Sequence, residues 1–188
     1  MEVSDGSNEQ LIELLAERKL DAVLTVLDEE TSKFAGRVLF KEPYVLAVPR
    51  DHRFGGRKCV KLADLQDEPF IVRTGCDRFQ DASHALVSRG IGIRVVYKTA
   101  HIDRTLALVA EGMGVSFIPA GLGTPGVKRV QVPDLGFFRA SGLLWRPERE
   151  DDCLNQFIAF AERHCVRDGR AHSRPYRHTP LGTMTAHG

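Results

Sequence analysis

The chain has 188 residues, of which 43% are hydrophobic and 27% charged, and its formal net charge at pH 7 is +1. That profile is typical of a globular protein with a sizeable core, and it excludes collagen-like, coiled-coil and wholly disordered chains. Residues 166–188 carry four Arg and one Asp, so the preceding body is slightly acidic. Such a body is not expected to bind nucleic acid on its own, because a nucleic-acid-binding surface needs positive charge to neutralise phosphates.

Neither export nor a membrane span is expected from the sequence. The first residues lack a basic segment followed by an apolar one, and no stretch approaches about 18 continuous apolar residues. We therefore expect a cytoplasmic protein. The absence of a C-x-x-C pair argues against a zinc ribbon or a secreted disulfide framework. The cysteines are Cys59, Cys76, Cys153 and Cys165.

Helices and strands alternate along the first half of the chain. Ser7, with Gln10 three residues later, predicts a capping box at the start of a helix that carries a leucine stripe. Pro43 is expected to interrupt the strand signal around it. In chain order, we expect a helix at residues 7–19, strands at 20–26, 37–40 and 44–48, a turn-rich crossing at 50–57, a short helix near 62–65 and a strand at 69–73.

The second half continues the alternation, which predicts an α/β fold with a mostly parallel sheet. Gly112 stands where a left-handed helix cap is expected. Two Gly/Pro-marked crossings, near residues 49–56 and 119–126, bracket a complete β/α set, as an inserted lobe would. Residues 166–188 are polar and aperiodic, which predicts a disordered tail. The remaining expected elements are helices at residues 77–89, 102–111 and 151–165 and strands at 91–97, 114–119, 127–132 and 140–145.

Five phrases in a fixed order resemble the effector-binding domain of LysR-type transcriptional regulators. They are VSDGSNEQLIELLAERKLDAVLT, EPYVLAVPRDHRF, VKLADLQDEPFIVRTGCDRF, LALVAEGMGVSFIP and LLWRPE. The resemblance covers about residues 3–165. It implies a type-2 periplasmic-binding-protein fold, in which two Rossmann-like α/β lobes are joined by two crossing strands and a small ligand binds in the cleft.

The resemblance also implies how the chain is divided. The first lobe is expected at residues 1–48 plus 122–165, the second at 49–121 and the tail at 166–188. Family members begin with a winged helix-turn-helix, a linker helix and the first strand and helix of the effector domain. None of these precedes Met1, so we expect a truncated reading frame or fragment that starts at the second strand, MEVSDG, with an incomplete first lobe.

Candidate binding residues surround the end of the strand at residues 69–73. Thr74 offers a hydroxyl, Gly75 permits close backbone approach, and the first N–H groups of the next helix suit a carboxylate or another small anion. The alternative is that Thr74 and Asp77 only cap that helix. The resemblance favours binding and adds residues that line the family's cleft, each of which also has an ordinary role in a turn, core or hinge. The predicted ligand-binding set is Thr25, Val26, Thr74, Gly75, Cys76, Asp77, Arg78, His101, Ile102 and Pro119.

Cys76 has a second interpretation. It lies near a helix start between Arg73 and Arg78, and such positive surroundings favour reaction of a thiol with oxidants. One branch of the LysR family senses peroxide with a cysteine in this loop and a resolving cysteine nearby. Residues 77–116 contain no cysteine here, so a reversible disulfide is the minority interpretation, and the other is a small apolar residue lining the loop.

The expected function is ligand sensing and oligomerisation, with no catalysis, metal or cofactor. Cys76 with His84 or His101 lacks any local signature of a nucleophile and base. The resemblance implies a small, carboxylate-bearing effector that shifts the arrangement of a homodimer or homotetramer, with DNA bound only through the absent N-terminal domain. Alternatives are a stand-alone solute-binding protein of the same fold and a redox-sensing regulator acting through Cys76.

Family dimers pair the helix at 8–18 with the partner's helix at 79–89. The resemblance therefore implies that Glu13, Arg18 and Arg89 are interface residues.

Overall fold

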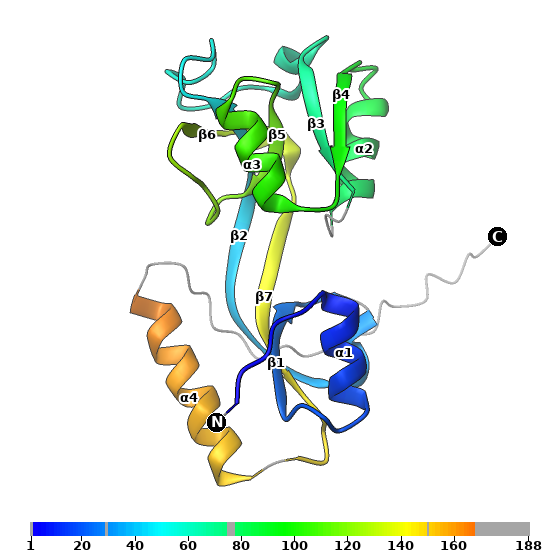
Figure 1. The fold of residues 1–188 in the computed structure, drawn as a ribbon, viewed down its shortest axis with the longest axis vertical. Coiled ribbons are helices and arrows are strands. Elements are labelled where there is room, and N and C mark those ends of the chain that lie inside the picture. The colour runs from blue at the N-terminus through cyan, green and yellow to red at the C-terminus, as the bar shows by residue number, and fades with distance from the viewer. Residues whose placement is uncertain (1, 29, 75–77, 150, 168–188) are drawn as a thin grey trace, which may run out of the picture. The chain divides into compact units, whose positions relative to one another are not determined.

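The computed structural model describes residues 2–28, 30–74, 78–149 and 151–167, which form two compact units (Figure 1). Unit 1 comprises Met1–Lys41 and Ala140–Gly188, and unit 2 comprises Glu42–Arg139. Strands β2 (Ala35–Pro49) and β7 (Phe138–Trp145) contribute residues to both units. The predicted disordered tail lies outside the described residues, apart from the end of the last helix.

The division between the units differs from the predicted lobe boundaries. Residues 42–48 and 122–139 were expected in the first lobe, but they belong to unit 2. The physical reason is strand pairing, because β6 (Val127–Gln131) runs antiparallel to β2 with Val130 opposite Leu46. Both side chains are buried in one cluster with Phe54. The Gly/Pro-rich stretches therefore lie within unit 2, and the chain passes between the units in β2 and β7.

Unit 1 packs two helices against a sheet that contains β1 (Ala22–Val26). Strand β1 pairs antiparallel with β7, and Val23 lies opposite Leu144. Helix α1 (Asn8–Ala16) buries Leu15 in a cluster with these two residues. Neighbouring residues of β7 point to the other face, where they pack against α4 (Asp152–Arg167). The sheet of unit 1 is thus covered by one helix on each face.

Several local predictions for unit 1 are confirmed and some are not. The Ser7 and Gln10 side chains form the expected capping box at the start of α1. The helix ends at Ala16, earlier than the expected Lys19, and Arg18 takes the left-handed conformation that follows many helix ends. Residues 2–6 were expected to form a strand, but they are exposed and make no ladder with β1.

Arg146, from the phrase LLWRPE, links α1 to β7 inside unit 1. Its side chain is buried, and Nη1 donates hydrogen bonds to the carbonyl oxygens of Leu15, at 2.7 Å, and Leu20, at 2.6 Å. The last carbonyls of a helix have no partner within the helix. Arg146 therefore provides hydrogen-bond donors to carbonyl oxygens at and just after the end of α1, although it lies more than 120 positions away in the sequence.

Unit 2 contains a β-α-β segment and a set of antiparallel strands. Strands β3 (Pro69–Arg73) and β4 (Arg94–Thr99) pair in parallel, with α2 (Phe79–Val87) between them in the chain. Helix α3 (Ile102–Ala110) follows β4, and Gly112 adopts the expected left-handed conformation after it. Strand β5 (Ser116–Pro119) runs antiparallel to β2. Short 3-10 helices occur at Glu30–Lys33 in unit 1 and at Leu62–Leu65 and Pro133–Leu135 in unit 2.

The prediction of a mostly parallel sheet is wrong for the pairs in the described residues. Strand β1 pairs antiparallel with β7, and β2 pairs antiparallel with both β5 and β6. Alternation of strands and helices indicates parallel pairing only where a helix returns the chain to the same end of a sheet. That holds for β3 and β4, whereas β2 and β7 pass from one unit to the other and run against their neighbours.

Pro43 does not interrupt the strand in which it lies, contrary to expectation. Strand β2 is continuous from Ala35 to Pro49, and the Pro43 carbonyl accepts a hydrogen bond of 2.9 Å from the Ala120 N–H. Proline lacks an N–H but keeps its carbonyl oxygen, so it is compatible with a strand at a position where only an acceptor is required.

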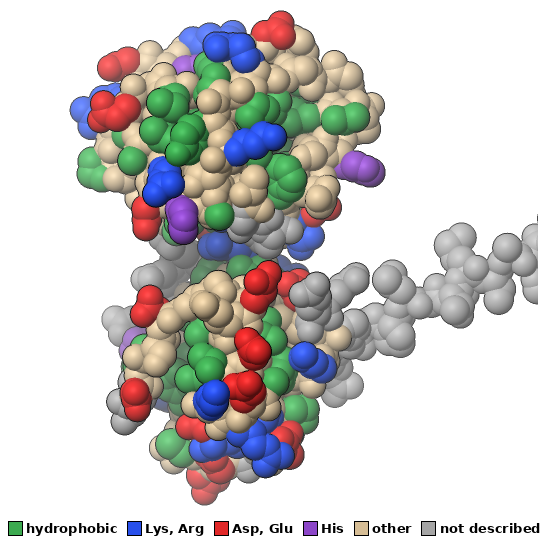
Figure 2. Space-filling model, turned by 45° about the vertical axis from the view of Figure 1, so that its right-hand side comes forward, with side chains coloured by type: hydrophobic (Ala, Val, Ile, Leu, Met, Phe, Trp, Pro, Cys, Tyr) green, Lys and Arg blue, Asp and Glu red, His purple; other side chains and the backbone are tan. Residues whose placement is uncertain are grey.

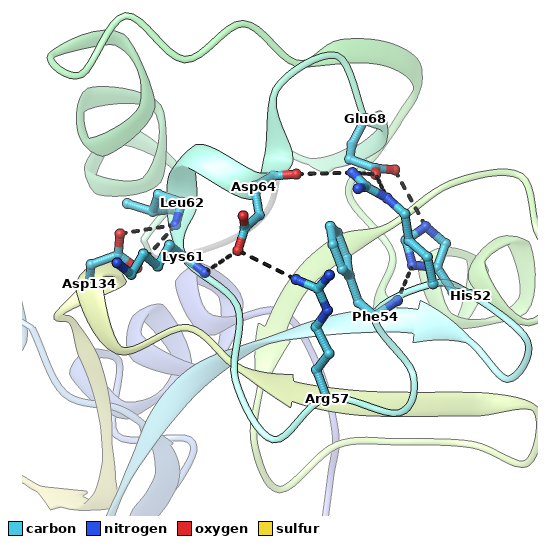
Figure 3. Close-up of polar contacts among 9 residues, drawn as sticks. His52, Phe54, Arg57, Lys61, Leu62, Asp64, Glu68 and Asp134 are labelled. Atoms are coloured by element: carbon cyan, nitrogen blue, oxygen red, sulfur yellow. Dashed lines mark hydrogen bonds and ion pairs between the residues drawn. The ribbon is translucent and has the colours of Figure 1, made fainter.

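The turn-rich segment at residues 50–57 is held by a polar network (Figure 3). Phe54 is fully buried, and the guanidinium groups of Arg53 and Arg57 lie 4.2 and 5.4 Å from its ring centroid. The buried carboxylate of Glu68 accepts hydrogen bonds from Arg53, and His52 Nε2 lies 3.4 Å from Glu68 Oε2. His52, Arg53 and Arg57 thus have partners within unit 2, so this segment has a structural role there.

Within the described ranges, no helix combines the length and apolar character needed to span a bilayer.

Candidate functional site

The carboxyl ends of β3 and β4 bring the start of two helices together in unit 2. Arg73 and Thr99 are paired at the end of the parallel ladder, and the Thr74 N–H donates to the Thr99 carbonyl at 2.8 Å. Each strand leads directly toward a helix. In open α/β sheets, ligands bind at the carboxyl ends of strands, where helices begin. This end of unit 2 is therefore the candidate ligand site.

The start of α3 is held by two threonines. The His101 N–H donates to Thr99 Oγ1 at 3.2 Å, and Thr105 Oγ1 donates to the His101 carbonyl oxygen at 3.0 Å. Thr99 and Thr105 are buried, so these contacts position the helix start firmly. The N-cap is His101, whose side chain forms no capping hydrogen bond. Because the first N–H groups of a helix have no partner within it, Ile102 and its neighbours offer donors to an anion.

The start of α2 is different, because its neighbouring arginine is already engaged. Arg78 is the N-cap, and its guanidinium donates to Asp81 Oδ2 at 3.0 Å and to the Phe138 carbonyl oxygen at 3.2 Å. Thr74 is exposed. The predicted residues Gly75, Cys76 and Asp77 lie outside the described residues. In unit 2 the structure thus brings Thr74 close to the backbone that leads to His101, with Arg78 bound to other groups.

The remaining predicted ligand residues lie elsewhere in the fold. Thr25 and Val26 are in β1 of unit 1, where the Thr25 hydroxyl donates to Asn8 Oδ1 at the start of α1. Pro119 is the last residue of β5, is buried, and lies opposite Tyr44 in the ladder with β2. Its position gives it a role in the sheet of unit 2.

Arg73 is the residue that the sequence-based prediction did not include in the site. It lines a hollow of about 50 Å³ with apolar side chains of β3, α2 and β5, including Phe70, Phe79, Leu86 and Phe117. Its Nε and Nη2 atoms are buried and have no hydrogen-bond partner among the residues that the structure describes. A charged residue at the end of the apolar run PFIVR was the available signal, although a strand end is also an ordinary place for a solvated arginine.

The predicted interface residues are exposed on their helices. Glu13 lies on α1, and Arg18 follows that helix and forms an ion pair of 3.4 Å with Glu148. Arg89 follows α2 and donates from Nη1 to the Ala85 carbonyl oxygen at 3.0 Å. These contacts leave the three side chains at the surface of their own units.

Acidic and basic side chains are interspersed on each unit over the face drawn in Figure 2, with hydrophobic side chains between them. This mixture matches the near-neutral charge of the chain. Among the described residues, no group of three or more His, Cys, Asp or Glu side chains is arranged to hold a metal ion.

Comparison with known sequences identifies the family. The model of the LysR substrate binding domain matches residues 1–166. The DNA-binding transcriptional dual regulator OxyR of Escherichia coli K12 is 29% identical over 153 residues, which are 78% of this chain and 50% of that protein. A probable hydrogen peroxide-inducible genes activator of Mycobacterium avium is 27% identical over 128 residues, covering 63% of this chain and 39% of that protein. The chain thus spans half or less of the length of these relatives.

Solved structures share the fold. The reduced form of OxyR superposes with a TM-score of 0.71 at 26% identity, covering 88% of this chain and 81% of that one. The effector binding domain of a BenM variant gives 0.73 at 19% identity, with 91% and 83% covered. The effector binding domain of QuiR in complex with shikimate gives 0.70 at 18% identity, with 86% and 79% covered. The resemblance seen in the sequence is confirmed, and the chain belongs to the LysR substrate-binding domain family.

Proposed function

We propose that this chain is the ligand-sensing part of a LysR-type regulator of transcription and that its effector carries a carboxylate. The observation that carries this proposal is the arrangement at the carboxyl ends of β3 and β4, where Thr74 and the start of α3 are both held by Thr99. The first N–H groups of a helix have no partner within the helix and can donate to an anion. Support also comes from the neighbour QuiR, whose structure holds shikimate, a carboxylic acid.

Effector binding changes the protein by differential affinity. A ligand that binds one arrangement of the two units more tightly than another shifts the population toward the first. Such a shift reaches DNA through the assembly, a homodimer or homotetramer in which the exposed Glu13, Arg18 and Arg89 contact a partner copy. DNA is bound by the part of the regulator that this chain does not match, since the match covers only half of E. coli OxyR. The protein acts in the cytoplasm, without catalysis.

The test is a thermal melt of the full chain with a panel of carboxylic acids, each paired with its neutral amide at the same ionic strength. A carboxylate at about 100 times its dissociation constant should add about 2.7 kcal/mol to the free energy of unfolding. Replacement of Thr74 by Val should weaken this effect, whereas Arg94→Gln, an exposed change on β4, should not. Equal stabilisation by each acid and its amide would show that no carboxylate is recognised.

A second candidate function is peroxide sensing through Cys76. One of the relatives favours it by name, the probable hydrogen peroxide-inducible genes activator of M. avium. A reversible response requires oxidation of the thiol to a sulfenic acid, with reduction of peroxide to water, followed by attack of a second thiol. Mass spectrometry after a peroxide pulse, on the natural chain and on Cys76→Ser, distinguishes the functions. A disulfide that includes Cys76 supports redox sensing, and unmodified Cys76 after the pulse rejects it.

A further inference from the structure

We propose that Arg73 binds the carboxylate of a compact aliphatic acid that enters the hollow beside α2. This inference rests on the proposed function, because it names the ligand class and the charged residue for the same end of unit 2. It is carried by two buried guanidinium nitrogens that have no hydrogen-bond partner among the described residues, and by the size and lining of the space around them.

Arg73 differs from three other arginines of the chain, whose guanidinium groups bind protein acceptors. Arg139 binds Glu42, Arg146 binds two backbone carbonyl oxygens, and Arg53 binds Glu68. Arg73 Nε and Nη2 are buried but lack any acceptor in the described part of the chain. Burial of an unpaired charge is costly, and proteins compensate it with an opposite charge or hydrogen bonds. Arg73 as a whole is only half-buried, so these two nitrogens are the part of the side chain that an acceptor on a bound group would satisfy.

The two unpaired atoms specify the shape of that group. Nε and Nη2 form one edge of the planar guanidinium, and carboxylates bind such an edge through charge-assisted hydrogen bonds. The same edge is used twice in unit 2, by Arg139 to bind Glu42 and by Arg53 to bind Glu68. A carboxylate is therefore the acceptor that this chain already places against this donor pair.

The volume and lining of the hollow limit the size and polarity of the rest of the ligand. Seven of the ten side chains that line it are apolar, among them Phe70, Phe79, Leu86 and Phe117. Its volume of about 50 Å³ is near one third of the roughly 150 Å³ cavity that accepts benzene. An aromatic ring does not fit without rearrangement, but a short alkyl chain does. The ligand is thus an acid with a short alkyl chain of one or two carbons, such as acetate or propionate.

The test is titration calorimetry on the full chain with sodium propionate, sodium benzoate and the neutral propionamide, at fixed ionic strength. We expect propionate to bind, propionamide not to bind, and benzoate to bind at least tenfold more weakly than propionate. Arg73→Gln should weaken propionate at least tenfold. Arg94→Gln removes an exposed positive charge from the same unit and should leave the affinity within twofold.

Stability of the unliganded chain provides an independent measurement. Arg73→Met removes two buried, unpaired nitrogens and retains an unbranched apolar stem, so the melting temperature without ligand should stay the same or rise. A fall would show that Arg73 stabilises the fold and would overturn the proposal. Propionate binding that Arg73→Gln leaves unchanged overturns this inference alone, whereas failure of every carboxylate to bind overturns the proposed function as well.

Discussion

Replacement of Glu42 by Gln should strongly destabilise unit 2, although the two side chains have nearly the same shape. Glu42 Oε1 accepts hydrogen bonds from Arg139 Nε at 3.1 Å and Nη2 at 2.5 Å, and Oε2 accepts one from the Gly121 N–H at 2.5 Å. Both oxygens are therefore acceptors facing donors. A glutamine has only one acceptor oxygen, so either orientation of its amide places an NH2 group against a donor.

The expected loss follows from burial. The side chains of Glu42 and Arg139 are 7% and 18% exposed, so breaking their pair leaves an uncompensated charge. Removal of one partner of a buried pair costs roughly 3–5 kcal/mol, and the lower end applies because Gln keeps part of the hydrogen bonding. The exposed pair of Arg149 with Asp21, whose side chains are 40% and 65% exposed, is worth less than about 1 kcal/mol. Arg149→Gln is therefore the matched control.

The assay is urea unfolding followed by circular dichroism. With a slope of about 1–3 kcal/mol/M, a loss of about 3 kcal/mol lowers the midpoint by roughly 1–3 M. A double variant that replaces both Glu42 and Arg139 by Leu should recover much of this loss, because it leaves no unpaired charge. Equal midpoints for Glu42→Gln and Arg149→Gln would refute the argument from burial.

Two further predictions concern unit 1. Gly142→Ala should cost about 2 kcal/mol or more in urea unfolding, because a Cβ there would overlap the Arg37 carbonyl oxygen. The control is Gly56→Ala, which has open space around it and should cost less than about 0.5 kcal/mol. Equal losses for the two variants would contradict this reasoning. The Leu154 N–H, which bonds to Asp151 Oδ1 at 2.9 Å, lowers the pKa of Asp151 below its ordinary value. The cap on α4 is therefore complete at neutral pH and is lost as the pH falls through that lowered pKa, which carboxyl NMR titration will measure; an ordinary or raised pKa would contradict the cap.

Local features were predictable because they depend on residues close together in the chain. The capping box of Ser7 and Gln10, the left-handed Gly112 and the order of helices and strands all follow from side chains within a few positions of one another. The five segments that resemble the LysR family also occur in a fixed order along the chain. The helix ends were less accurate, since the last turn depends on what caps it, as at Arg18.

Part of the candidate site was also predictable from the chain. The strand end at PFIVR and the helix start at His101 were both located by periodicity and by the family resemblance. Their pairing through Thr74 and Thr99 and the burial of two Arg73 nitrogens required the tertiary structure. A sequence shows that an arginine ends an apolar strand, but solvent exposure and partners depend on helix packing.

The sequence alone therefore determined the family, the order of the elements and the residues around which a ligand site is built. Tertiary structure decided the antiparallel pairing of β7 with β1 and of β2 with β5, the boundaries of the two units and the partners of the buried charges. The reason is distance along the chain: Glu42 and Arg139 are 97 residues apart, and Arg146 and Leu15 are 131 apart. Local periodicity carries no information on which distant donor meets which acceptor, because packing of the whole unit selects those pairs.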